Sequence, residues 1–364
     1  MTATIMLIDD QTLLVESLAQ ELRNQLGNEA HVEVWVPKKE EKPIERFAQL
    51  LAQHDVRLVV TDYDLTEGQL GFFGSSVVDW CQNQAIPVGD FSRGHASSLA
   101  QEPNMFELRV PVESSDAAAN YVGAVFRGFT AIRSAIDNTP DLMHQRSPAA
   151  VVAAFLGEKH LESQFAQYGI RYGGANSALV DRFVATASPS IKPDPDRVAT
   201  LLTYITGHLL VNAILRFPGP ILGEDALAAY LAVDIAEAPK YEALLADANY
   251  EGPFAKLKQY RWTHVVDKIL SGYDDQVSDN ESFNTTGALN RRRLEIALGT
   301  SLARPTECKR CDGLEGGFYC PFTKRTVCQR SDCSVVSNIW IPAGARLARF
   351  EREFYDEWSP ILGM

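Results

Sequence analysis

The sequence predicts a doubly wound α/β domain with a five-stranded parallel sheet, followed by a mostly α-helical domain with a small Cys-rich zinc module. Three observations support this fold class. Short apolar segments alternate with amphipathic helical segments over residues 1–137, helical periodicity dominates residues 148–300, and five of the six cysteines lie between Cys308 and Cys333. Alternating strands and helices are typical of a parallel sheet, and the flavodoxin-like strand order is a common solution for five strands.

The first region contains five apolar segments that are predicted to be strands, at residues 4–8, 32–36, 58–61, 86–91 and 106–110. The segment at 58–61 has no alternation of polar and apolar residues, which suits a strand buried on both faces. Helices are expected between the strands. The first of them ends at Gly27, and the last, after residue 110, begins at a cap formed by Ser114 or Ser115.

The remaining sequence divides into a linker at 138–147, a helical effector domain at 148–300 and a Cys-rich module at 301–364. Ser147 and Pro148 are typical residues for the start of a helix. Further helices are predicted at 175–186, 196–217, 224–232, 239–247 and 253–270. A hairpin is predicted at 318–327 and a C-terminal helix at 345–358.

Composition restricts the partners that the chain can attract. The formal net charge of −13 disfavours bulk attraction to nucleic acid or to an anionic membrane. No apolar run approaches the roughly 20 residues that a membrane-spanning helix needs. The N-terminus has no basic region followed by an apolar one, so we expect no export signal and a cytoplasmic protein.

Acidic residues follow two of the predicted strands. Asp9 and Asp10 come after the first strand, and Asp62 comes after the third. In the flavodoxin-like order these strands are neighbours, so the three carboxylates should converge at the carboxyl edge of the sheet. Clustered carboxylates suit a hard cation, and we predict a Mg²⁺ site that could position a phosphoryl donor.

The strand ends carry a family resemblance. Leu7-Ile8-Asp9-Asp10, Val59-Val60-Thr61-Asp62 and Pro87-Val88-Gly89-Asp90-Phe91-Ser92 resemble the corresponding segments of the receiver domain of bacterial response regulators. The resemblance covers residues 1–137, and the remainder of the chain resembles no family that we can name. It implies a receiver-like fold and a role in two-component signalling, with a sensor histidine kinase or phosphotransfer protein, and other signalling proteins, as partners.

The resemblance also implies residue roles. Asp62 would accept the phosphoryl group, and Ser92 would sense it through its hydroxyl group. Asp9, Asp10 and Asp62 would hold Mg²⁺, with the carbonyl oxygen of Asp64 completing the metal shell.

The sequence departs from the family at the end of the fifth strand. Receivers carry a lysine before a proline there, whereas this chain has Val110 before Pro111. Arg109 is adjacent, but neighbouring side chains of a strand face opposite ways, so it could replace the lysine only through a bulge or a register change. The alternative hypothesis is therefore a pseudo-receiver that acts as an interaction scaffold without being phosphorylated.

The cysteine cluster predicts a metal site. Cys308 and Cys311 form a two-residue knuckle, and Cys320, Cys328 and Cys333 follow. Zinc takes four such ligands in a tetrahedron, so four of these five cysteines are expected to bind a structural Zn²⁺, with reduced thiols or an iron–sulfur cluster as alternatives. The spacing favours Cys328 and Cys333 as the second pair of ligands. It does not decide whether Cys320 replaces one of them or stays a buried thiol.

Two weaker signals concern other functions. Residues 291–330 carry nine basic and four acidic side chains, which makes this segment the best candidate for binding nucleic acid, although that partner is not favoured. A helix-turn-helix beginning near residue 226 is disfavoured because its second helix would be acidic. His208 and His264 lie among apolar residues and are interpreted as structural, so the helical region shows no catalytic constellation.

Overall fold

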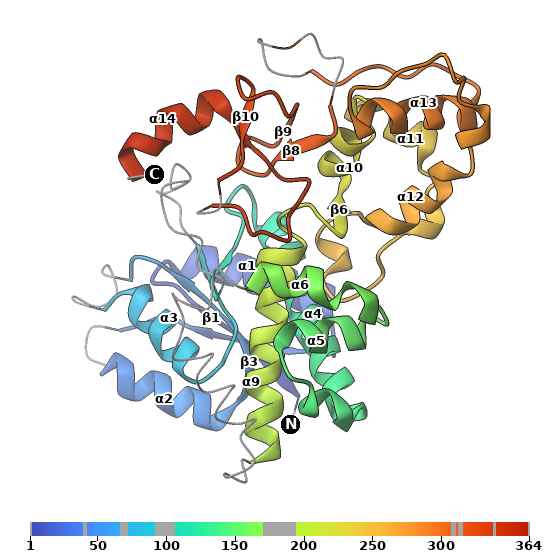
Figure 1. Ribbon diagram of the computed structural model, residues 1–364. Helices are drawn as coiled ribbons and strands as arrows, with labels where there is room; N and C mark the ends of the chain where they lie inside the picture. The colour runs from blue at the N-terminus through green and yellow to red at the C-terminus, as the bar shows by residue number, and fades with distance from the viewer. Residues whose placement is uncertain are drawn as a thin grey trace. The chain divides into compact units, whose positions relative to one another are not determined.

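The computed structural model describes residues 2–38, 42–65, 72–91, 106–169, 194–306, 311, 316–337 and 340–362 (Figure 1). The described residues divide into two compact units. The first draws on residues within 1–98, 104–151 and 176–208, and the second on residues within 152–175 and 209–364. The domain boundaries drawn from the sequence stay predictions, and each unit is described by itself.

The first unit is built on a five-stranded, wholly parallel sheet in the order β2-β1-β3-β4-β5. Its strands are β1 (Ala3–Ile8), β2 (His31–Trp35), β3 (Asp55–Asp62), β4 (Val88–Phe91) and β5 (Leu108–Arg109). The predicted parallel sheet and its flavodoxin-like order are confirmed, and this order is compatible with a receiver-like fold. Leu58, Val59 and Val60 in β3 are at most 1% exposed, as expected for a strand covered on both faces.

Among the described residues of this unit, the longer helices beside the sheet are α1 (Thr12–Leu26), α2 (Pro43–Gln53), α3 (Gly74–Asn83), α4 (Ser115–Asn138) and α9 (Pro195–His208). Helix α1 ends at Gly27, whose φ of 50° is one that glycine adopts easily, as predicted. Ser114 caps α4 by accepting a hydrogen bond from the backbone N–H of Ala117. Helices α2 and α3 cover the sheet face that carries Met6, Ile8, Val59 and Val88.

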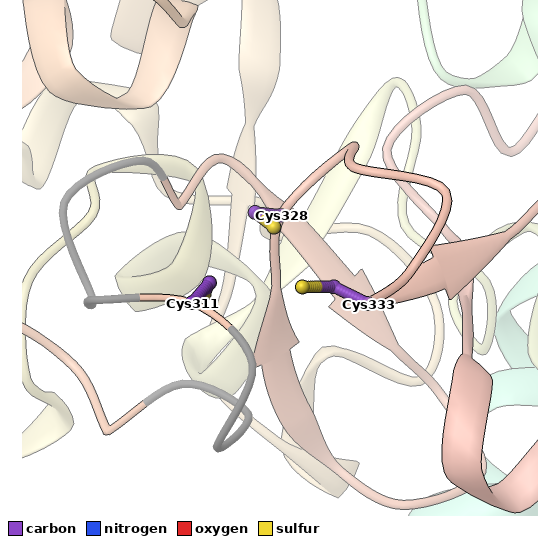
Figure 2. A group of neighbouring side chains, drawn as sticks. All are labelled: Cys311, Cys328 and Cys333. Carbon is purple, nitrogen blue, oxygen red and sulfur yellow. The ribbon is translucent and has the colours of Figure 1, made fainter.

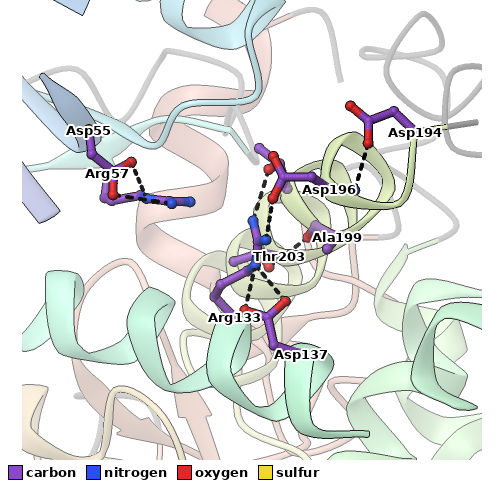
Figure 3. A network of polar contacts seen from close by, with 9 residues as sticks. Asp55, Arg57, Arg133, Asp137, Asp194, Asp196, Ala199 and Thr203 are labelled. Carbon is purple, nitrogen blue, oxygen red and sulfur yellow. Dashed lines mark hydrogen bonds and ion pairs between the residues drawn. The ribbon is translucent and has the colours of Figure 1, made fainter. Parts of the chain in front are cut away.

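A polar network joins α9 to α4 (Figure 3). The guanidinium of Arg133 on α4 donates hydrogen bonds to Asp137 at 2.9 Å, to Asp196 at 2.6 Å and to the hydroxyl of Thr200 at 3.0 Å. The hydrogen bond and charge of Arg133 lower the pKa of Asp196. One side chain therefore connects two helices that lie far apart in the sequence.

Replacing Arg133 with methionine is expected to raise the pKa of Asp196 toward its ordinary value. Because the folded-state pKa is lowered, this carboxylate stabilises the fold above its unfolded-state pKa, and that contribution is lost as the pH falls through the folded-state pKa. Asp196 is 74% exposed, so the pair contributes less than about 1 kcal/mol. An NMR titration of Asp196 measures the shift. Arg197→Met, which removes an exposed guanidinium one residue along the same helix, should leave this pKa low.

The second unit contains short helices and three two-stranded antiparallel sheets, β6-β7, β8-β9 and β10-β11. Its longer helices are α6 (Glu162–Gly169), α10 (Glu224–Tyr230), α12 (Thr263–Ser271), α13 (Thr286–Leu298) and α14 (Arg352–Leu362), with α11 (Ala238–Tyr241) as a single turn. The strands are β6 (Ile221–Gly223), β7 (Tyr260–Trp262), β8 (Phe318–Cys320), β9 (Arg325–Val327), β10 (Ser334–Val335) and β11 (Phe350–Glu351). Helix α5 (Pro148–Phe155) begins where Ser147 and Pro148 predict.

Several predicted helices differ from the structure. The helix predicted at 253–270 is wrong in its first half, because β7 pairs with β6 and α12 begins only at Thr263. The strand buries Tyr260 and Trp262, and large aromatic residues suit strands. The predicted helix at 196–217 is α9 followed by a π-helical segment, Leu209–Ile214. The tail helix begins at Arg352, since Phe350 and Glu351 pair with β10. The prediction at 175–186 falls outside the described residues.

The hairpin predicted at 318–327 is confirmed as β8 and β9, whose register pairs Phe318 with Val327 and Cys320 with Arg325. Among the described residues, no helix is long and apolar enough to cross a lipid bilayer.

Candidate metal centres

The carboxyl edge of the parallel sheet brings Asp9, Asp10 and Asp62 together. Each offers a carboxylate oxygen, and these oxygens all lie within 4.8 Å of one another. The convergence follows from strand pairing, because Ile8 at the end of β1 is the register partner of Thr61, one residue before Asp62. Asp9 is 3% exposed, whereas Asp10 and Asp62 are half-buried.

Local backbone hydrogen bonds orient two of these carboxylates. Asp9 Oδ1 accepts a hydrogen bond from the N–H of Gln11 at 2.7 Å, and Asp62 Oδ1 accepts one from the N–H of Tyr63 at 2.8 Å. Three carboxylates this close repel one another, and the repulsion is offset when a cation lies between them. The oxygen-only donor set therefore fits a hard divalent cation such as Mg²⁺.

A close approach of α3 holds the backbone at Asp62. The N–H of Gly74 donates to the carbonyl oxygen of Tyr63 at 3.0 Å, and a methyl group at residue 74 would overlap the carbonyl oxygen of Asp62. Only a residue without a side chain fits between α3 and the end of β3. Gly74 therefore helps to position the acidic group.

Replacing Gly74 with alanine is expected to destabilise the first unit by about 1–3 kcal/mol, because the backbone around Asp62 must move to relieve the overlap. Denaturant unfolding measures the change. Gly123→Ala on α4 is the matched control within the same unit, since a methyl group there meets its nearest atom at an ordinary 3.5 Å. We expect that control to be neutral or slightly stabilising, because alanine is the better helix former. Equal stabilities for the two variants would contradict the close approach.

The other predicted receiver residues have different surroundings. Asp64 is exposed two residues after Asp62, and Ser92 lies outside the described residues. Arg109 is exposed at the end of β5, where it is the register partner of Asp90. Val110 is 6% exposed. One of its methyl carbons fills the space that a β-carbon at position 89 would need. Gly89 thus leaves space that Val110 fills, which accounts for a glycine inside an otherwise apolar strand.

The cysteine cluster forms a second group. The sulfur atoms of Cys311, Cys328 and Cys333 lie within 4.8 Å of one another, and Figure 2 shows the three side chains close together. Cys328 directly follows β9, and Cys333 directly precedes β10. A tetrahedral ion bound at 2.3 Å to each sulfur places the sulfurs about 3.8 Å apart, so the group could hold a metal ion.

Cys320 has a different environment. It is fully buried, and its sulfur accepts backbone N–H groups from Thr323 at 3.5 Å and from Glu351 at 3.3 Å. Among the described cysteines it does not belong to the cluster of three. Cys308, the other half of the predicted knuckle, lies outside the described residues.

Arg349 supports the loop between Cys328 and Cys333. Its guanidinium donates hydrogen bonds to the hydroxyl of Ser334 at 2.6 Å and to the carbonyl oxygen of Ser334 at 3.2 Å. The Ser334 hydroxyl in turn donates to the carbonyl oxygen of Cys328. Burial lowers the pKa of Arg349, and the negative charge of a Cys328 thiolate opposes that shift. Arg349 therefore places a guanidinium group beside the loop between Cys328 and Cys333.

Several basic side chains of the segment at 291–330 form ion pairs. Arg292 binds Glu281 at 3.0 Å, Arg293 binds Asp274, and Arg325 binds Glu351 at 3.2 Å. Paired guanidinium groups are less available to phosphates. These ion pairs weaken the argument for nucleic acid that rests on the count of charges.

A third group was missed by sequence reasoning. Glu158, His160 and His264 offer ligand atoms within 4.8 Å of one another, although His264 was interpreted as structural. Glu158 and His160 are separated by one residue, a spacing that suits two ligands of one metal ion. His264 is distant in the sequence, so only the fold shows that it lies beside these two residues.

Comparison of the chain with protein-family models, with curated protein sequences and with solved structures found no match.

Proposed function

We propose that this chain is a phosphorylation-controlled signalling protein in which Asp62 accepts a phosphoryl group. The observation that carries the proposal is the convergence of Asp9, Asp10 and Asp62 at the ends of adjacent parallel strands. The strand order and the receiver-like motifs support it. The donor would be a sensor histidine kinase or a phosphotransfer protein.

The reaction is a phosphoryl transfer to a carboxylate. A carboxylate oxygen of Asp62 attacks the phosphorus of the donor, the bond from phosphorus to the leaving group breaks, and an acyl phosphate forms. A bound Mg²⁺ would neutralise charge on the transferred group. Asp9 and Asp10 would hold that ion, and the N–H of Tyr63 orients the attacking carboxylate through its bond to Oδ1.

Phosphorylation would act through charge. It adds about −1.5 to −2 charge to a group that already contains three carboxylates. In this proposal Ser92 senses the phosphoryl group, and the helical and Cys-rich regions are the output that responds to it.

A pseudo-receiver scaffold is the second candidate function, and Val110 favours it. The position where receivers carry lysine is occupied by a buried valine that packs at Gly89, and the neighbouring Arg109 is exposed. Without a cation at that position, the phosphoryl oxygens would lose a charged partner. The sheet would then serve as a surface for other signalling proteins.

Phospho-donor labelling separates the two functions. The full-length protein is incubated with Mg²⁺ and a small phospho-donor, then weighed intact. A mass gain of one phosphoryl group that depends on Mg²⁺ supports the signalling function. No gain would leave the scaffold as the better proposal.

For the cysteine cluster we propose structural Zn²⁺, bound by Cys311, Cys328 and Cys333 with a fourth thiolate. The knuckle spacing favours Cys308 as the fourth ligand. With four thiolates no coordination position stays open, so this ion would stabilise the fold and would not take part in catalysis.

Nucleic acid remains a less favoured partner, and a gel-shift measurement with DNA and RNA at physiological salt tests it.

A further inference from the structure

Two histidines and a glutamate converge in the second unit. They belong neither to the group of three aspartates nor to the cysteine cluster. Glu158 precedes the 3-10 turn Lys159–Leu161, His160 lies within that turn, and His264 lies in the first turn of α12. The start of α12 is fixed by Thr263, whose N–H donates to the carbonyl oxygen of Pro220 at 3.0 Å and whose hydroxyl donates to that of Gly219. The fold therefore holds His264 in place.

The distances fit a single metal ion. Glu158 Oε2 lies 3.2 Å from His160 Nδ1 and 3.9 Å from His264 Nε2. The two imidazole rings meet edge to face, with centroids 5.2 Å apart. An ion with bonds of 2.0–2.1 Å in tetrahedral geometry places its ligand atoms about 3.4 Å apart, and the two observed distances lie on either side of that value.

We propose that Glu158, His160 and His264 form an open binding site for a divalent transition-metal ion of the zinc class. Two imidazoles and one carboxylate are a donor set that such ions prefer, whereas Mg²⁺ and Ca²⁺ prefer oxygen atoms alone. Three protein ligands leave at least one coordination position for water or a substrate. This separates the site from the cysteine cluster, whose thiolates would enclose their ion.

The exposure of the ligands agrees with an exchangeable ion. The side chain of Glu158 is 21% exposed, that of His264 is 38% exposed and that of His160 is 60% exposed. Among the described residues, the buried His264 Nδ1 has no hydrogen-bond partner. Coordination through Nε2 places the ring proton on Nδ1, and Nε2 is the nitrogen that lies near Glu158.

A cavity adjoins the site. It has a volume of about 270 Å³, and its lining includes His264, Gln164, Asp267, Tyr230 and Arg346. The hydroxyl of Tyr230 donates to Asp267 at 2.7 Å, and burial raises the pKa of this tyrosine, so the hydroxyl keeps its proton at neutral pH. A small polar molecule in this cavity would lie beside a ligand of the ion.

A similar group in the first unit lacks these features. His31, Glu33 and His54 also lie within 4.8 Å of one another, but the ring of His31, on the edge strand β2, and the ring of His54, after α2, stack nearly parallel at 13°. No cavity described for this chain includes any of the three. The group at Glu158 therefore carries the proposal.

Metal counting on the full-length protein tests the site. The protein is dialysed against micromolar Zn²⁺ and its bound zinc is measured. We expect one equivalent of zinc at this site in the wild type. His264→Ala and Glu158→Gln should lose that equivalent, because the affinity of the site for zinc falls by about tenfold or more in each variant. His144→Ala, which removes an exposed histidine elsewhere, is the control and should keep that equivalent.

Two further measurements exclude misfolding and assign the ligands. Cys333→Ser should keep the equivalent that His264→Ala loses, and His264→Ala should keep the circular dichroism spectrum of the wild type. Cobalt bound at this site should absorb through its d–d bands without thiolate charge transfer. Equal zinc contents in wild type and His264→Ala, or a signal that comes only with thiolate charge transfer, would overturn the proposal.

Discussion

Replacing Cys328 with serine is expected to release the zinc ion that we propose for the Cys-rich module, and to unfold that module. A hydroxyl group is a much weaker ligand for zinc than a thiolate, and Cys328 is fully buried with Cys311 and Cys333 around it. Structural zinc supplies on the order of 10 kcal/mol of folding free energy to small modules. The strands on either side of the cluster, β9 and β10, are only three and two residues long.

Metal analysis and hydrogen exchange measure the two effects. We expect Cys328→Ser to bind about one equivalent of metal fewer than the wild type, together with fast exchange of the amide groups in β8, β9 and β10. Cys320→Ser is the matched control, because it changes a buried thiol of the same hairpin that lies outside the cluster of three. A control that loses its metal as completely as Cys328→Ser would show that the ligands have been assigned wrongly.

The arrangement of the sheet could be predicted because its signals are local. Apolar segments without alternation, such as Leu58 to Val60, fixed the positions of buried strands, and the alternation with helices left few possible orders. Pairing of β1 with β3 then placed Asp9, Asp10 and Asp62 at one edge, as the sequence predicted. In this region, local pattern and global fold agree.

The errors occurred where long-range pairing decides the structure. Tyr260 to Trp262 forms a strand only because Ile221 to Gly223 lies beside it, and nothing in the segment itself opposes a helix strongly. The choice among five cysteines could not be made from spacing, since Cys320 differs from its neighbours through hydrogen bonds to its sulfur. The group at Glu158 depends on a partner from a distant segment, and a pattern search along the sequence does not detect it.

Phosphorylation of Asp62 is the second large effect that we expect. In Asp62→Ala the mass gain of one phosphoryl group should disappear, because the attacking carboxylate is gone. Asp64→Ala is the matched control. Its exposed side chain has no predicted role, since the metal shell would use only its carbonyl oxygen, and alanine keeps that atom. Labelling of Asp64→Ala should therefore equal that of the wild type.

Arg109→Ala then tests how the chain functions without the usual lysine. If the guanidinium reaches the phosphoryl group, its removal should lower the yield of phosphorylated protein at a given donor concentration, because a charge-assisted hydrogen bond is lost. The regular pairing of Asp90 with Arg109 in β4 and β5 gives no sign of a bulge that would turn this side chain toward the acidic group. We therefore expect an unchanged yield for Arg109→Ala, with the carboxylates and their cation sufficient for the transfer. A mass gain that survives Asp62→Ala would mean that another residue accepts the phosphoryl group, and the proposed function would then fail.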